Sequence, residues 1–116
     1  MKIIQVINAM ITNSQKISDV NLKDNEYFFL YNNKYKWSIS KSSDTDNYWL
    51  HYYPHGEMNI KQLSQITNWT GFQFVSYSTE DIKTKEAYES FTELYQIVQN
   101  KLYGLDAIFE EIITDF

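Results

Sequence analysis

The chain has 116 residues, 43% hydrophobic and 17% aromatic, with three glycines and one proline, which suits one folded domain over residues 1–116 and leaves no room for a second. Its net charge is −5, and all ten of its basic residues are lysines. Arginine supplies the bidentate contacts to guanine edges and phosphates, and an acidic chain is repelled by a phosphate backbone, so we expect no nucleic-acid binding.

Cysteine is absent, which excludes disulfides, thiolate metal sites and cysteine nucleophiles. No window approaches the roughly 20 consecutive apolar residues that a membrane span requires. The N-terminal stretch is interrupted by Gln5 and Asn8 and lacks a small-residue cleavage site. We therefore expect a cytoplasmic protein that does not enter the membrane.

The first twelve residues carry apolar side chains at helical spacing, including Ile3, Ile4, Ile7 and Met10. This spacing predicts an amphipathic N-terminal helix over 1–12, with a strand over 2–7 as the alternative. The polar run 13–25 is expected to be a connection that touches the core intermittently.

Two aromatic-rich runs in "EYFFLYNNKYKWSIS" are separated by Asn32 and Asn33, which tolerate the positive φ of a tight turn. The sequence therefore predicts a β-hairpin here. A third strand, "NYWLHYY", is expected to end at Pro54, and "FQFVSY" over 72–77 is predicted to be a fourth strand.

Helical periodicity over 83–102 predicts an amphipathic helix that ends near Gly104, and 105–116 predicts a second one. The expected fold class is therefore α+β: an antiparallel meander sheet of three to four strands, packed with two C-terminal helices and an N-terminal helix.

The histidines at 51 and 55 stand four residues apart, with Glu57 two residues further on. This spacing would suit zinc on a helix, but Pro54 and Gly56 are incompatible with one, and zinc normally takes three or four protein ligands. We therefore expect no metal and no other cofactor. A small enzyme centred on His51, His55 and Glu57 is the alternative function, but no nucleophile elbow or glycine-rich phosphate loop accompanies them, so we expect no enzymatic activity.

The third predicted strand is rich in aromatic residues on both of its faces. Either helices cover both faces of the sheet, or one aromatic face meets a partner. Tyrosine and tryptophan anchor protein interfaces because they bring large contact area and lose little rotamer entropy. The candidate contact residues are Tyr48, Trp49, His51, Tyr53, His55 and Glu57.

A second candidate surface is the acidic side of the 83–102 helix, where Glu86, Glu89 and Glu93 lie on the same side as Ile97. From residue 80 onward there are nine acidic residues and three lysines, which gives this part of the chain a charge of −6. A solvated helix face accounts for such a pattern, and so does docking to a basic partner.

The sequence therefore favours a small acidic protein-binding module, by analogy of size and charge an inhibitor of the immunity- or antitoxin-protein kind. Besides the small enzyme, the remaining alternative is a homo-oligomer, for instance a homodimer, that buries the aromatic face against its own copy.

Overall fold

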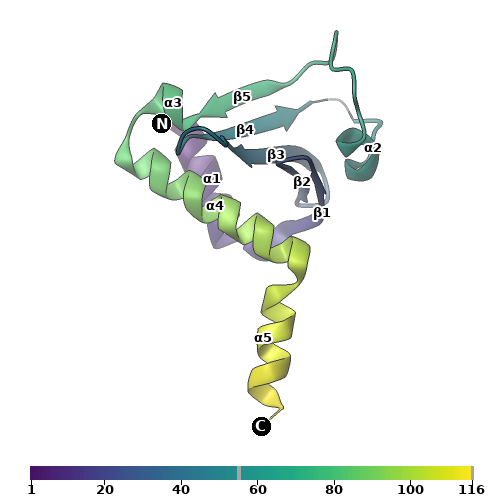
Figure 1. The fold of residues 1–116 in the computed structure, drawn as a ribbon, viewed down its shortest axis with the longest axis vertical. Coiled ribbons are helices and arrows are strands. Elements are labelled where there is room, and N and C mark those ends of the chain that lie inside the picture. Colours follow the sequence, from purple (N-terminus) through teal and green to yellow (C-terminus); the bar gives the residue numbers. More distant parts are fainter. Residues whose placement is uncertain (55, 116) are drawn as a thin grey trace.

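The sheet consists of five antiparallel strands that lie side by side in the order of the chain (Figure 1). The computed structural model describes residues 1–54 and 56–115. The strands are β1 (Ile17–Lys23), β2 (Glu26–Tyr31), β3 (Tyr35–Lys41), β4 (Tyr48–Tyr53) and β5 (Val75–Ser78). The helices are α1 (Lys2–Thr12), the 3-10 turn η1 (Ser14–Lys16), α2 (Ile60–Ser64), α3 (Thr79–Ile82), α4 (Lys85–Tyr103) and α5 (Leu105–Thr114). The α+β class and the antiparallel meander are confirmed, with five strands rather than three to four.

The predicted hairpin is formed by β2 and β3. Asn32 and Asn33 have φ values of 56° and 55°, and the Lys34 N–H donates to the Tyr31 carbonyl over 3.2 Å. Two left-handed central residues define the turn whose twist matches that of paired strands. This turn sets the register in which Phe29 lies opposite Trp37.

The stretch 13–25 is not the connection that the sequence predicted, because most of it forms η1 and the edge strand β1. The pairing of β1 with β2 is irregular between Ser18 and Asn21, where Asp19 has a φ of 52°. This bulge interrupts the alternation of apolar and polar residues, so the strand shows no period of two in the sequence.

The fourth predicted strand is displaced. The ladder to β4 begins at Val75 and ends at Ser78, so Phe72 and Phe74 precede it. These two phenylalanines pack instead against aromatic rings on one face of the sheet. Phe72 and Phe74 alternate with polar residues as side chains in a strand do, but they belong to a loop that folds over the sheet.

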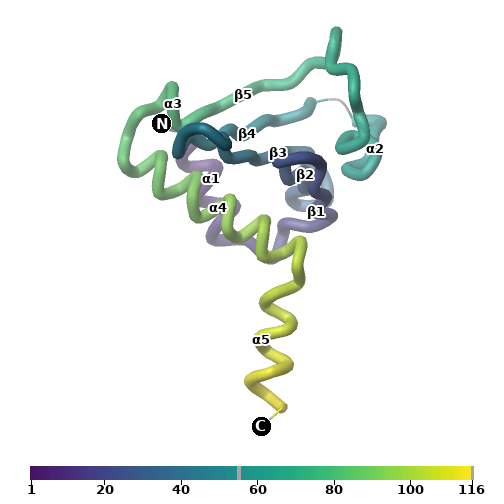
Figure 2. The backbone as a smooth tube through the Cα atoms, viewed as in Figure 1, coloured from purple at the N-terminus to yellow at the C-terminus, as the bar shows by residue number. Residues whose placement is uncertain are grey.

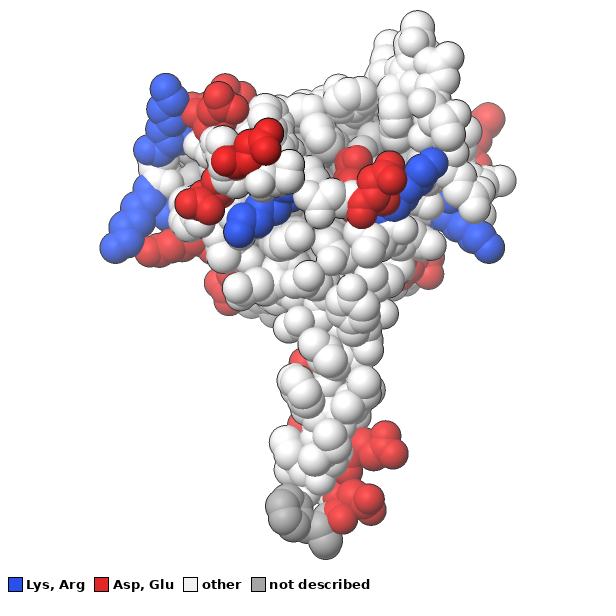
Figure 3. Space-filling model, viewed as in Figure 1, with Lys and Arg blue, Asp and Glu red and all other residues white. Residues whose placement is uncertain are grey.

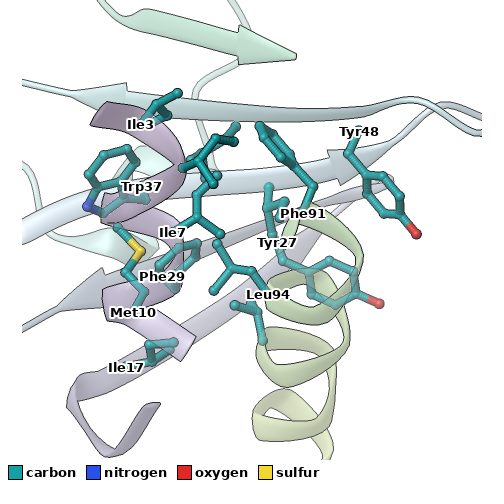
Figure 4. Packing of buried hydrophobic residues seen from close by; sticks show 14 of the residues in the cluster. Ile3, Ile7, Met10, Ile17, Tyr27, Phe29, Trp37, Tyr48, Phe91 and Leu94 are labelled. Atoms are coloured by element: carbon teal, nitrogen blue, oxygen red, sulfur yellow. The ribbon is translucent and has the colours of Figure 1, made fainter. Parts of the chain in front are cut away.

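The two faces of the sheet are covered differently. Helices α1 and α4 contact each other and cover one face, where side chains such as Ile7, Phe29 and Phe91 form the main core (Figure 4). The opposite face carries a smaller cluster made by Phe28, Tyr53 and two residues of α2, Ile60 and Leu63. The residues of β2 alternate between these two clusters, with Tyr27 and Phe29 in the main core and Phe28 in the smaller cluster.

The last helix leaves the body of the molecule. Helix α4 ends at Gly104, which has a φ of 62°, and α5 then projects away from the sheet to the C-terminal end (Figures 1 and 2). None of the described residues of α5 is buried. The expectation that both C-terminal helices pack on the sheet is therefore wrong for α5, because an amphipathic pattern shows which side of a helix is apolar and does not show what covers it.

Candidate functional site

The side chains of the aromatic strand β4 point alternately to the two faces of the sheet. Tyr48 joins the main core beneath α4, where its ring packs edge-on against Tyr95. Trp49, His51 and Tyr53 point to the face that carries α2. Tyr48 and Tyr53 are each only 4% exposed, so these two candidate contact residues belong to the core.

The segment between α2 and β5 covers the end of β4 on the α2 face. The Trp69 ring lies 5.7 Å from that of Tyr53 and 6.3 Å from the parallel ring of Phe28, measured between ring centroids. The Phe74 ring meets the His51 imidazole edge-on at 5.3 Å. Much of this aromatic face is therefore occupied by aromatic residues of the same chain.

A polar network lies within this aromatic cluster. The Ser38 and Tyr53 hydroxyls both donate to the Oε2 atom of Glu26, the latter over 3.1 Å, and they lie 2.8 Å from each other. Burial and the negative charge of Glu26 raise the pKa of Tyr53, so its phenol stays protonated and remains a donor. The Glu26 network, meaning Glu26, Ser38 and Tyr53, thus holds a carboxylate in place through two hydroxyl donors.

His51, a member of the alternative enzyme site, lies near this network, with its ring 6.4 Å from that of Tyr53 between centroids. Its Nδ1 atom lies 2.6 Å from the Ser76 hydroxyl oxygen. Burial lowers the pKa of His51, and the negative charge of Glu26 partly opposes this shift. Glu57 is exposed, and the carboxylate whose charge acts on His51 is Glu26.

His55 lies outside the described residues, so the predicted cluster of His51, His55 and Glu57 is not assembled in the part of the chain that the structure describes. Within that part, no three histidines, aspartates or glutamates are grouped so that they could hold a metal ion.

A pocket of about 380 Å³ opens beside the Glu26 network. Its aromatic wall consists of Phe28, Trp49 and Trp69, and the Glu26 carboxylate lines it together with small polar residues. The remaining lining residues are Lys23, Asp24, Asn25, Ser40, Lys41, Ser42, Ser43, Ser64 and Ile66. Of the candidate residues from the sequence, only Trp49 lines this pocket.

Sequence reasoning missed Glu26 and Trp69. Glu26 pairs with Ser40 in the ladder, and the register of three strands brings it to Ser38 and Tyr53. The one available signal was a carboxylate at the start of an aromatic strand, and such a signal does not reveal which side chains meet across a sheet.

The acidic side of α4 is exposed, as predicted, at Glu86, Glu89 and Glu93. Lys85 forms an exposed ion pair with Glu89 over 3.8 Å, and such surface pairs contribute about 1 kcal/mol or less to stability. Ile97 is half-buried against the main core. The expectation that Ile97 lies on the exposed acidic side is therefore wrong.

Helix α5 carries an apolar surface that the sequence reasoning had assigned to the core. Ile112 and Ile113 are 63% and 60% exposed, and Ile108 and Phe109 are exposed beside them. Helical spacing places Glu110 and Glu111 away from these apolar side chains and Asp106 beside Ile113, and Figure 3 shows acidic side chains in red on the projecting helix. We call the side formed by Leu105, Ile108, Phe109, Ile112 and Ile113 the α5 apolar side.

Comparison with known proteins gives no relative: no protein-family model, curated protein or solved structure matches this chain. Among the described residues, none of the helices has the length and hydropathy needed to cross a membrane. Any function is therefore argued from the surfaces of this chain alone.

Proposed function

We propose that the protein is a non-enzymatic protein-binding module that docks on its partner through α5. The observation that carries this proposal is the exposure of the α5 apolar side on a helix that projects from the body of the molecule (Figure 1).

A helix of ten residues has little stability of its own in water, because isolated helices shorter than about 12–15 residues are marginal. Most helices in proteins are stabilised by packing of their apolar side, whereas none of the described residues of α5 is buried. Burying one side chain such as Ile112 contributes roughly 1.5–3 kcal/mol before the losses that accompany association. A partner groove that takes Ile108, Phe109, Ile112 and Ile113 would therefore both order the helix and bind the chain.

The charge of α5 indicates which kind of groove fits. Asp106, Glu110, Glu111 and Asp115 lie between residues 105 and 115, a stretch with no lysine. Two such helices side by side would bring like charges together, whereas an apolar groove flanked by lysines or arginines would complement them. The partner is thus a basic protein, and inhibition of that partner, as immunity and antitoxin proteins achieve, is the form of binding that we favour.

Affinity capture from a lysate of the source cells tests this function. The tagged wild type is compared with the double variant Ile112→Ser/Ile113→Ser and with Leu22→Ser/Val75→Ser, which removes two exposed apolar side chains from the edge strands. We expect one stoichiometric protein with the wild type and the edge-strand variant, and its loss with the α5 variant. Retention of that protein by the folded α5 variant would show that α5 is not the docking element.

A further inference from the structure

We infer that the pocket beside Glu26 binds an organic cation, an ammonium or guanidinium group on an aliphatic stem. This site lies on the α2 face of the sheet and does not depend on the docking role of α5.

The Glu26 carboxylate supplies the negative charge for this site. Two hydroxyls, those of Ser38 and Tyr53, hold its Oε2 atom, and neither neutralises it. Among the described residues, the ion pair joins Lys85 and Glu89 on α4, and Glu26 forms hydrogen bonds to hydroxyls instead. Within the described part of the chain, this half-buried carboxylate is held by hydrogen bonds and not by an ion pair, so it gains a favourable interaction when a cation enters the pocket.

The two lysines that line the pocket differ in where their charges lie. The Lys41 ammonium lies over the Tyr48 ring, 5.7 Å from its centroid, and Tyr48 packs in the core on the other face of the sheet. Its charge is therefore directed away from Glu26. Lys23 lies opposite Glu26 in the ladder of β1 and β2, so it is the one cation of the lining that faces the same side.

The aromatic wall suits a cation with an apolar stem. Indole faces attract ammonium and guanidinium groups most strongly among the aromatic side chains, and Trp49 and Trp69 both line the pocket. Phe28, whose ring is parallel to that of Trp69, extends the apolar surface against which a stem would pack. The volume of about 380 Å³ is at the small end of ligand pockets, which fits one side chain or a small amine.

Two sources supply this chemistry: a free small amine, and a lysine or arginine side chain of a protein. The probes are n-butylammonium, N-acetyl-lysine methylamide and N-acetyl-arginine methylamide, with the uncharged N-acetyl-norleucine methylamide as control. Binding is followed by tryptophan fluorescence and by NMR shifts of the Trp49 and Trp69 indole N–H groups. A free amine is indicated if n-butylammonium binds as tightly as the amino-acid amides, and a protein side chain if the amides bind more tightly.

Charge-altering variants test the assignment of roles. Glu26→Gln keeps an acceptor for Ser38 and Tyr53 and removes the charge, so it should weaken binding of the cations about tenfold or more. Lys23→Met removes the competing cation and should strengthen binding. Glu57→Gln, which removes an exposed carboxylate outside the pocket, and Ile112→Ser/Ile113→Ser in α5 should both leave binding unchanged.

The inference is overturned if the norleucine amide binds as tightly as the lysine amide, or if no cationic probe shifts either indole signal. It is also overturned if acetate or phosphate binds instead, in a manner that Lys23→Met abolishes and Glu26→Gln strengthens. If Glu26→Gln fails to fold, the inference is tested with two other variants. Lys23→Met should strengthen cation binding, and Trp49→Leu should weaken it. None of these results bears on α5, so the pocket and the docking helix are tested separately.

Discussion

The Tyr53 hydroxyl contacts both other members of the Glu26 network. It lies 2.8 Å from the Ser38 hydroxyl oxygen and donates a hydrogen bond to Glu26. Tyr53→Phe removes this hydroxyl, so Ser38 and Glu26 each lose one hydrogen-bond partner. We expect the free energy of unfolding to fall by about 1–3 kcal/mol. Urea denaturation measures this, with Tyr52→Phe as the matched control, since Tyr52 lies on the opposite face of the same strand. Equal, small effects of both substitutions would show that the network contributes nothing.

His51 makes stability depend on pH. Its pKa is lowered in the folded protein from 6.5, so the unfolded chain binds a proton more readily than the folded one. The stabilisation is fully present above pH 6.5 and is lost as the pH falls toward the folded-state value. The free energy of unfolding should therefore decrease between about pH 7.5 and about pH 5.5, before most carboxylates titrate.

His51→Gln should flatten this pH dependence, because glutamine does not titrate and retains polar atoms for Ser76. His55→Gln is the matched control for the second imidazole. Urea denaturation at several pH values checks the expectation, and an unchanged slope in His51→Gln would contradict the assigned shift.

At the scale of single residues, the sequence predicted that β4 carries aromatic side chains on both of its faces, but it did not predict their partners. It grouped His51 with Glu57 because they are close in the chain, whereas Glu26 acts on His51 from a strand two positions away in the sheet. Contacts across a sheet depend on register, and register depends on turns and bulges that single residues do not reveal.

Among the elements, the β2–β3 hairpin depends on the left-handed residue Asn33. Asn33→Ala places a side chain that disfavours this conformation at a φ of 55°, so we expect a loss of about 1 kcal/mol. Asn33→Gly should be neutral or stabilising, because glycine adopts positive φ readily. Thermal or urea unfolding of the two variants checks this contrast, and an equal loss in both would show that the turn conformation is not the cause.

Helix α5 should contribute nothing to the stability of the body. A chain that ends at Gly104 loses α5, in which no described residue is buried, so its free energy of unfolding should match that of the full chain within about 0.5 kcal/mol. Urea denaturation of both chains measures the difference. A loss of several kcal/mol on truncation would place α5 against the sheet.

The elements that sequence predicted well are those with local signals. Helices α1 and α4 show an uninterrupted helical period, and the hairpin has its two asparagines. Strand β1 was missed because its bulge at Asp19 breaks the alternation. The position of α5 could not be predicted, because the same amphipathic pattern serves a helix that packs on its own sheet and one that packs on another protein.

At the scale of the whole molecule, charge is divided along the chain. Residues up to 79 carry a net charge of +1, and those from 80 onward, which include α4 and α5, carry −6. The acidic residues of this part of the chain are exposed, so dissolved salt screens their charge. Association with a basic partner should therefore be fast at low salt and slower at high salt.

Site-specific photo-crosslinking in the source cells tests the role of α5 most directly. Benzoylphenylalanine is incorporated in place of Phe109, on the α5 apolar side, and in a separate strain in place of Tyr35, an exposed aromatic residue of β3. We expect one basic protein to be crosslinked through position 109 and not through position 35. A product of two copies of this chain from position 109 would assign the helix to a homodimer, and the same crosslinks from both positions would contradict docking through α5.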